Sequence, residues 1–254
     1  MKQRIILGIL LLSPCWFSNA LPGLFAQASE EASVAPDGGT TNHIQGIFIT
    51  QLANAPFSAK EEVEWTRSLA DGTVVNSKYY SHVARDTQGR VYRENRKIIP
   101  ANSTKEPPLN YSFVLNPESR TRTTCYPATQ ICRVTSYRPA TELHPPAVKP
   151  GAGKDPSLQR EPLGTETIEA LEVIGTRETR TVRADAIGNE HEFAVTKEVW
   201  YSPHLQINLS VVRNDPRIGK QTLKMTEISM DEPDLQLFEP PAGYRIVDER
   251  KEIQ

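Results

Sequence analysis

Hydrophobic and polar positions alternate with period two over much of this chain. Within residues 61–69, Val63, Trp65 and Leu69 fall on one face, whereas Glu, Thr and Ser occupy most of the other positions. Period two is typical of β-strands that have one buried face. The segment is therefore predicted to be a strand with these three apolar side chains on its inner side.

Turn signals divide the rest of the chain into further strands. Asp71-Gly72 and the Asp-Thr-Gln-Gly sequence at 86–89 reverse the chain twice, so residues 61–98 should form an antiparallel meander. Other strands are predicted at 45–52, 111–115, 165–178, 193–202, 206–214, 220–229 and 244–247. The segment 45–52 is interpreted either as a first strand or as an extended lead-in. One short helix is expected at 233–238, so the fold class is mainly β with little helix.

A proline-rich segment separates two groups of strands. The chain has 20 prolines among 254 residues, about 8% against a usual ~5%, and six of them lie within 138–162. That range has no apolar period, so a linker or long loop is expected there. The predicted order is a flexible lead-in at 29–42, an N-terminal β block at 43–137, the linker, and a C-terminal β block at 163–248 that completes the same sheet.

Residues 1–28 have the pattern of an export signal. Two basic residues precede an apolar run at 5–12, and small-residue cleavage sites follow at Ala20 and Ala28, of which the second fits better. The apolar run is too short to span a bilayer. We therefore expect a periplasmic or secreted protein with no transmembrane segment after signal cleavage.

The cysteines agree with export. Cys15 leaves with the signal, and Cys125 and Cys132 remain as an even pair. The sequence around them predicts a hairpin in which Tyr126 pairs with Ile131, so that the two cysteines lie directly opposite each other, within disulfide distance. The C-x6-C spacing differs from the C-x-x-C of redox enzymes, so a structural disulfide is favoured over a redox or metal pair.

Charge and motifs restrict the function. With 29 Lys+Arg against 31 Asp+Glu, the net charge is −2, which argues against a nucleic-acid partner. The sequence contains no nucleophile elbow and no phosphate-binding loop, and its five histidines share no ligand spacing. We therefore predict no cofactor, no metal and no marked catalytic residue. A secreted hydrolase with an unmarked site stays as a third hypothesis.

Aromatic and arginine side chains are the candidate binding residues. If the inner face of the sheet is a ligand groove, Trp65 and Trp200 should line it together with Val63, Leu69 and Phe193; the alternative is that both tryptophans are ordinary core.

Arg85, Arg90 and Arg93 form the densest charged cluster and are candidates to grip an anionic group. The structural interpretation is favoured for this cluster: Asp86 and Gly89 make the turn, and the arginines line a solvated strand face.

Several short motifs resemble a family of uncharacterised exported bacterial proteins. They include Leu69-Ala-Asp-Gly72, Arg85-Asp-Thr-Gln-Gly-Arg90, Glu198-Val-Trp-Tyr-Ser202, Asp215-Pro-Arg217 and Leu237-Phe238. The C-terminal pattern, a tryptophan-bearing strand, two further strands, a Leu-Phe turn and Pro-x-Gly-Tyr, is also similar to the LolA/LolB-like half-barrel of lipoprotein carriers and envelope-stress regulators. That resemblance implies an open half-barrel, a curved antiparallel sheet whose concave face can shelter acyl chains.

These observations together predict a non-catalytic envelope protein that binds an apolar or amphipathic ligand, such as a lipid, an acyl chain or a lipoprotein. The alternative is a module that docks or senses an envelope protein along an open sheet edge.

Overall fold

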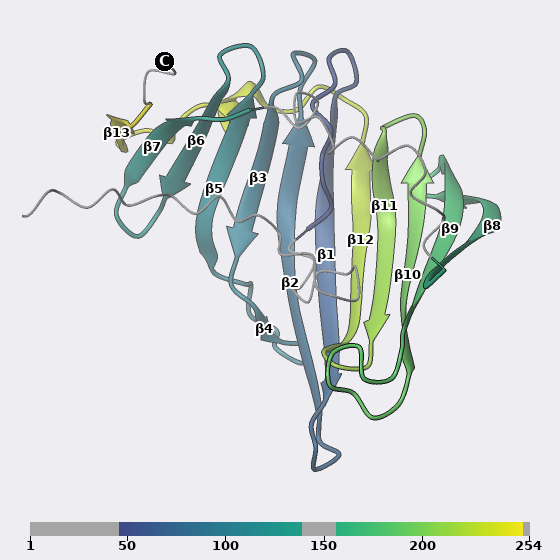
Figure 1. Cartoon of the computed structure of the whole chain (residues 1–254). Coiled ribbons are helices and arrows are strands. Elements are labelled where there is room, and N and C mark those ends of the chain that lie inside the picture. Colours follow the sequence, from purple (N-terminus) through teal and green to yellow (C-terminus); the bar gives the residue numbers. More distant parts are fainter. Residues whose placement is uncertain (1–45, 139–155, 251–254) are drawn as a thin grey trace, which may run out of the picture. The chain divides into compact units, whose positions relative to one another are not determined.

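The computed structural model describes residues 46–138 and 156–250. The predicted signal peptide, the lead-in at 29–42 and most of the proline-rich segment lie outside the described residues. The regular secondary structure of the described part is almost entirely strand (Figure 1). Its elements are β1 (Phe57–Ser68), β2 (Val74–Arg85), β3 (Val91–Arg96), β4 (Ile99–Pro100), β5 (Leu109–Asn116), β6 (Thr121–Tyr126), β7 (Ile131–Ser136), β8 (Leu158–Ile168), β9 (Leu171–Val182), β10 (Phe193–Ser202), β11 (Ile207–Asp215), β12 (Gly219–Ser229), the 3-10 helix η2 (Leu235–Phe238) and β13 (Arg245–Asp248).

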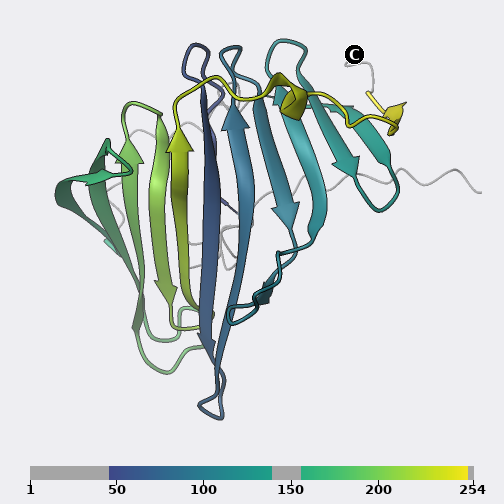
Figure 2. The same ribbon diagram turned by 180° about the vertical axis from the view of Figure 1, so that it is seen from behind.

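All the strands belong to one 13-stranded sheet in the order β13-β7-β6-β5-β3-β2-β1-β12-β11-β10-β9-β8, with β4 paired to β2. Neighbouring strands are antiparallel except β13, which runs parallel to β7. The two halves of the chain join at the centre, where Val63 of β1 lies opposite Leu223 of β12. The sheet is curved and does not close on itself (Figures 1 and 2). The predicted fold class, a curved antiparallel sheet with little helix, is confirmed.

Two predicted element boundaries were wrong. The expected single strand at 165–178 is the hairpin of β8 and β9, which turns at Glu169 and Ala170 with φ of 49° and 62°. Neither residue type marks a turn, so the sequence gives no signal there. The hairpin makes β8 begin at Leu158, inside the range that was assigned to the linker. Residues 46–52 form no strand, so the interpretation as an extended lead-in is right for the described part of that segment.

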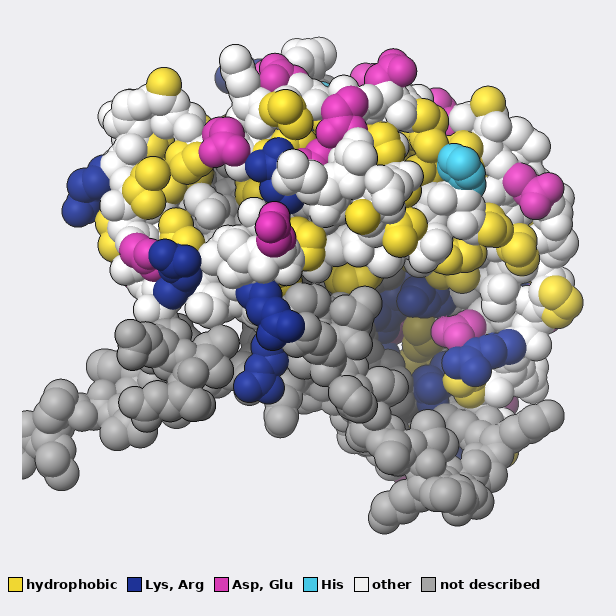
Figure 3. Space-filling view, turned by 90° about the horizontal axis from the view of Figure 1, so that it is seen from above, with side chains coloured by type: hydrophobic (Ala, Val, Ile, Leu, Met, Phe, Trp, Pro, Cys, Tyr) yellow, Lys and Arg dark blue, Asp and Glu magenta, His cyan; other side chains and the backbone are white. Residues whose placement is uncertain are grey.

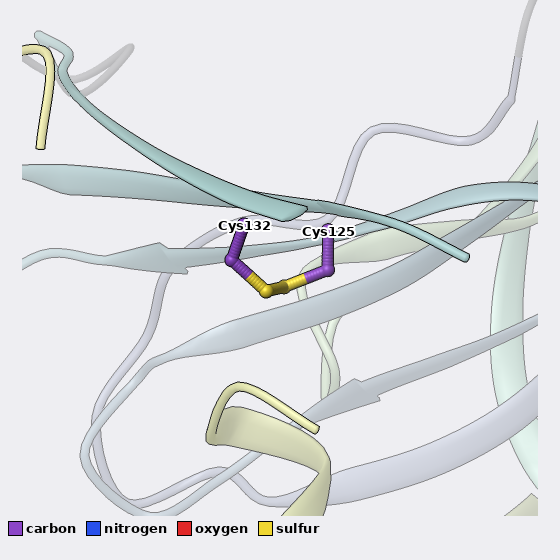
Figure 4. Close-up of a disulfide and its surroundings, with 2 residues drawn as sticks. All are labelled: Cys125 and Cys132. Carbon is purple, nitrogen blue, oxygen red and sulfur yellow. A yellow bond between two sulfur atoms is a disulfide. The ribbon is translucent and has the colours of Figure 1, made fainter. Parts of the chain in front are cut away.

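The cysteine hairpin has the predicted register. Cys125 lies opposite Cys132 and Tyr126 lies opposite Ile131. The two cysteine Cα atoms are 4.0 Å apart and the sulfur atoms are bonded (Figure 4). The predicted disulfide is therefore confirmed as a link between β6 and β7.

Residues 46–56, which we call the inner segment, lie across one face of the sheet. Ile47 and Ile49 are buried in the same apolar cluster as Phe57, Val63 and Leu223. An ion pair between Glu61 of β1 and Arg93 of β3 holds the segment in place. Glu61 accepts the backbone N–H of Ile47, and Arg93 donates to the backbone carbonyl of Ile47 at 2.7 Å. We call the face that carries this segment the inner face.

Arg85 also fixes the inner segment. Its guanidinium group is fully buried and donates to the carbonyls of Ala55 (2.7 Å), Thr50 (2.8 Å) and Leu205 (3.0 Å). Burial lowers the pKa of Arg85 to about 10, so the side chain keeps its charge at neutral pH. The expectation of a solvated arginine face is therefore wrong for Arg85, because its strand position points inward.

Candidate functional site

An open groove of 420 Å³ lies on the inner face, along β1 beyond Glu61. Its central side chains come from neighbouring strands and share one face, because Val63 pairs with Tyr79, Trp65 pairs with both Ser77 and Gln221, and Asn95 pairs with Tyr111. We call it the inner groove. It is lined by Val63, Trp65, Ser77, Lys78, Tyr79, Asn95, Arg96, Ile98, Asn110, Tyr111 and Gln221. Its volume falls within the range of about 300 to 1,000 Å³ that is usual for ligand pockets.

Apolar and aromatic side chains dominate the middle of the groove. Val63 is buried and continues the core into the groove, whereas Trp65 is half-buried. The indole of Trp65 is oriented by its N–H, which donates to the carbonyl of Ile218 at 2.8 Å. Burial, with a smaller contribution from Glu61, raises the pKa of Tyr79, so its phenol is neutral at physiological pH. The middle of the groove therefore offers neutral, largely apolar surface to a ligand, and Lys78 and Arg96 add two basic side chains to the lining.

A charged cluster adjoins the Trp65 end of the groove. Asp215, the last residue of β11, is fully buried and accepts hydrogen bonds from Arg213 (3.0 Å) and from Arg217 Nη2 (2.8 Å). Burial alone would raise the pKa of Asp215, but hydrogen bonds from Arg217 and Arg213 outweigh it and hold the pKa below its usual value. We call these three residues the Arg-Asp-Arg cluster. In the view from above, basic, acidic and apolar side chains line a hollow of the molecule (Figure 3).

The structure brings only part of the predicted aromatic set together. Val63 and Trp65 line the inner groove, whereas Leu69 lies beyond the end of β1 and is 40% exposed. Trp200 is half-buried elsewhere, with its ring packed over Gly175 of β9. Phe193 lies 5.3 Å from the guanidinium of Arg217, next to the charged cluster and outside the groove lining. The inner groove thus contains Trp65 and not Trp200.

The predicted arginine cluster holds the fold together. Arg90 binds Asp86 at 2.6 Å and Glu239 at 3.3 Å, and it lies 4.9 Å from the ring of Phe238. This contact ties the turn before β3 to η2. Arg93 pairs with Glu61, as described above. Arg90 and Arg93 thus bind groups of the fold itself, but the expected solvated face is wrong for them too, because their side chains are only 14% and 15% exposed.

Sequence reasoning missed most of the polar residues of the site. Arg213 and Gln221 stand at inward positions of strands that otherwise carry apolar residues there, such as Val211 and Leu223. The sequence did carry a signal for them: each is a charged or amide residue at a position where the alternation calls for an apolar one. Because buried polar groups need partners, such a residue indicates a polar site on the inner face.

Across the described ranges, 46–138 and 156–250, no cluster of three His, Cys, Asp or Glu side chains could hold a metal ion. Within the same residues, no helix is long and apolar enough to cross a membrane.

No protein-family model matches the chain, and no curated protein matches it. The family of uncharacterised exported proteins therefore stays a prediction. Solved structures do match. MucB of Pseudomonas aeruginosa, in a complex with MucA, is 9% identical with a TM-score of 0.38; the match covers 76% of this chain and 58% of that one. The chain thus spans less than two thirds of MucB.

Two further similar structures cover more of their own length. LprF from Mycobacterium bovis is 13% identical with a TM-score of 0.30, and the match covers 70% of this chain and 88% of that one. A LolA superfamily protein from Nitrosomonas europaea is 8% identical with a TM-score of 0.27, and the match covers 74% and 92%. Similarity to a LolA superfamily protein is thus found, at low identity and with a low TM-score.

Proposed function

We propose that this protein is a non-catalytic, exported component of the cell envelope that binds the apolar part of an amphipathic ligand, a lipid or an acyl chain. The observation that carries the proposal is the inner groove, in which Val63, Trp65, Tyr79 and Tyr111 present apolar surface on an unclosed sheet. The buried core under the inner segment ends at Val63, so an acyl chain that enters beside Trp65 would extend the core.

The size of the groove suits a single chain. Each buried methylene contributes about 0.8 kcal/mol, so about ten methylenes would supply roughly 8 kcal/mol before the costs of ordering the ligand. The remaining affinity would depend on polar groups at the margin, such as Gln221 and Asn95.

Docking of a protein strand along the open edge is the weaker alternative. The sheet order ends in β13 on one side and in β8 on the other, and residues 162–164 of β8 contain a bulge. Pro162 offers no N–H, and Gly164 has a φ of +91°. Proline and bulges on an edge strand hinder the addition of a further strand, so this edge is poorly built for augmentation.

Tryptophan fluorescence tests the proposal, since only Trp65 and Trp200 follow the predicted signal. Trp200→Phe leaves Trp65 as the reporter in the groove, and Trp65→Phe leaves Trp200 as a matched control outside it. Decanoate or a short-chain detergent should shift the emission of the Trp65 reporter and leave that of the Trp200 reporter unchanged. An unchanged Trp65 reporter, in a protein whose circular dichroism is native, would reject the inner groove as a ligand site.

A further inference from the structure

The sheet is split between β2 and β3, beside the inner groove. The pairing of these strands ends at Val83 and Arg93, and β2 meets its next described partner on that side, Ile99 of β4, only at Lys78. Residues 79–82 therefore have no described strand beside them on this side, and Figures 1 and 2 show β2 and β3 diverging there. The hydrogen-bonded ladder is thus interrupted at this place.

A second cavity meets the inner groove at this split. Its volume is 530 Å³, and it is lined by Lys60, Glu62, Val63, Glu64, Lys78, Tyr79, Tyr80, Ser103, Thr104, Lys105 and Glu106. Glu62 and Glu64 flank Val63 along β1, and successive side chains of a strand point to opposite faces, so this cavity lies on the outer side of the sheet. We call it the outer cavity. Val63, Lys78 and Tyr79 line both cavities, so the outer cavity and the inner groove adjoin each other across the interrupted ladder.

Ion pairs within the fold engage part of the charge of the outer cavity. Lys60 lies 2.9 Å from Glu62 and 3.5 Å from Glu227, and Glu106 lies 2.6 Å from Arg96. Each of these side chains already has an opposite charge beside it, so these charges are less available to a ligand.

Lys78, Lys105 and Glu64 are the other charged residues of the outer cavity. Lys78 lies directly opposite Glu64 in the pairing of β1 with β2, but the two side chains form no ion pair. Among the described residues, none of these three side chains has an ion pair or a hydrogen bond. Two ammonium groups and one carboxylate are therefore available, and such a set complements a head group that itself carries charges of both signs.

We propose that the outer cavity binds the head group of the ligand, and that this head group is zwitterionic, with a phosphate and an ammonium group. The inference deepens the proposed function and rests on it. The apolar chain lies in the inner groove along Val63 and Tyr79, and the ligand crosses the sheet at the split. Lys78 and Lys105 each donate a charge-assisted hydrogen bond to a phosphate oxygen, and Glu64 binds the ammonium group.

Three ligands with the same ten-carbon chain test the head-group site: decanol, decyl phosphate and decylphosphocholine, titrated at pH 8 with Trp65 as the reporter. Each exposed charge contact should contribute a factor of about two to five, so decylphosphocholine should bind roughly tenfold more tightly than decanol. Lys78→Met should lower the affinity for decylphosphocholine about two- to fivefold and leave that for decanol unchanged. Lys220→Met is the matched control, because Lys220 is an exposed lysine that lines neither cavity, and it should leave both affinities unchanged.

Glu64 gives the sharpest test, because the two charged ligands should respond in opposite directions. Glu64→Gln removes the partner of the ammonium group and also a negative charge that repels phosphate. The affinity for decylphosphocholine should fall about two- to fivefold, whereas the affinity for decyl phosphate should rise by a similar factor. An affinity for decylphosphocholine that stays the same or rises in this variant would overturn the zwitterionic head group.

A fluorescent label tests on which face the head group lies. After signal cleavage, Thr104→Cys provides one free thiol in the outer cavity for acrylodan, since Cys125 and Cys132 are bonded to each other. Asn214→Cys, at an exposed position of β11 that lines neither cavity, is the matched control. Decylphosphocholine should shift the emission of the label at position 104 and leave that at position 214 unchanged. An unchanged label at position 104, with normal binding at Trp65, would overturn the outer cavity as the head-group site.

The outcomes separate this proposal from the proposed function. Equal affinities for the three ligands in the unmodified protein would overturn the head-group site and leave the acyl groove standing. Binding of none of them would overturn both. Glycerophosphocholine, which has the head group without an acyl chain, is the last arm: failure to compete at millimolar concentration supports an amphipath, and competition would show a site for free head groups and overturn that assignment. Thermal unfolding of each variant checks that the fold is retained.

Discussion

Thr50 and Gln51 are consecutive in the chain, but their side chains bind opposite halves of the sheet. Thr50 Oγ1 donates to the carbonyl of Gln206, directly before β11, at 2.8 Å. Gln51 Nε2 donates to the phenol oxygen of Tyr137, directly after β7. Six strands separate β7 from β11 in the sheet order, a distance of roughly 34 Å in a flat sheet. Two adjacent side chains reach both places only because the sheet bends around the inner segment.

Removing the ion pair under the inner segment should destabilise the protein. Glu61→Ala leaves the charge of Arg93 without its carboxylate and the N–H of Ile47 without its acceptor. We expect the free energy of unfolding in urea to fall by about 3 to 5 kcal/mol. Glu61→Gln, which keeps an acceptor for Ile47, should cost less. Asp248→Asn is the control, because it removes an ion pair whose arginine, Arg250, is half exposed. If the control lowered the urea midpoint as much as Glu61→Ala does, the argument would be contradicted.

The disulfide should stabilise the β6–β7 hairpin through the unfolded state. Cys125 and Cys132 are separated by seven positions, and closing so short a loop contributes roughly 2.5 kcal/mol in the chain-entropy model. The double variant Cys125→Ser/Cys132→Ser should lose about that much in urea unfolding and retain its fold. Thiol counting on the unreduced, unfolded protein should find no free thiol between these two cysteines; two free thiols would disprove the bond.

Acid should destabilise the protein as two buried carboxylates become protonated. Burial raises the pKa of Glu94, but hydrogen bonds from Arg96 and from the N–H of His82 outweigh it, and Asp215 behaves alike. A carboxylate with a lowered folded pKa adds stability above its unfolded pKa, about 4, and loses it as pH falls through the folded value. We expect unfolding free energy to decrease below about pH 4. Asp215→Asn should flatten that dependence; an unchanged slope would contradict the assignment.

Gly175 tests the packing of Trp200. A Cβ atom at this position would lie 2.5 Å from the indole ring and 2.8 Å from the Cβ of Leu163. Gly175→Ala should therefore cost about 1 to 3 kcal/mol of stability through overpacking. The same change in a Trp200→Leu background should cost less, because the smaller side chain can give way. An equal loss of stability in both backgrounds would show that the Trp200 ring is not what excludes a side chain at position 175.

Local signals in the sequence predicted local structure well. The hairpin of Cys125 and Cys132 follows from turn residues and one pairing register, and the predicted range 193–202 coincides with β10. The turn at Glu169-Ala170 was missed because its positive φ angles are imposed by the pairing of β8 with β9, against the preference of both residues.

The candidate site was harder to predict, because it depends on pairing between distant strands. Alternation places Trp65 on an inner face, but only the register of β1 against β12 brings it to Gln221 and Arg213. The strand of Trp200 was predicted correctly, but its neighbours were not: the ring packs over Gly175 of β9. Sequence periodicity predicts which face of its strand a side chain occupies. It does not predict which residues of other strands lie beside that side chain.

The central pairing of β1 with β12 has a consequence for how the chain reaches its fold. Val63 meets Leu223, a partner 223 − 63 = 160 positions later, so the middle of the sheet is its least local contact and its closure is expected to be slow. A chain that emerges N-terminus first presents β1 with one unpaired edge until β12 follows. Lys60, Glu62 and Glu64 alternate along that strand, and such charges discourage association between waiting chains. The charged side of β1 is therefore expected to keep its unpaired edge from adding a strand of another chain.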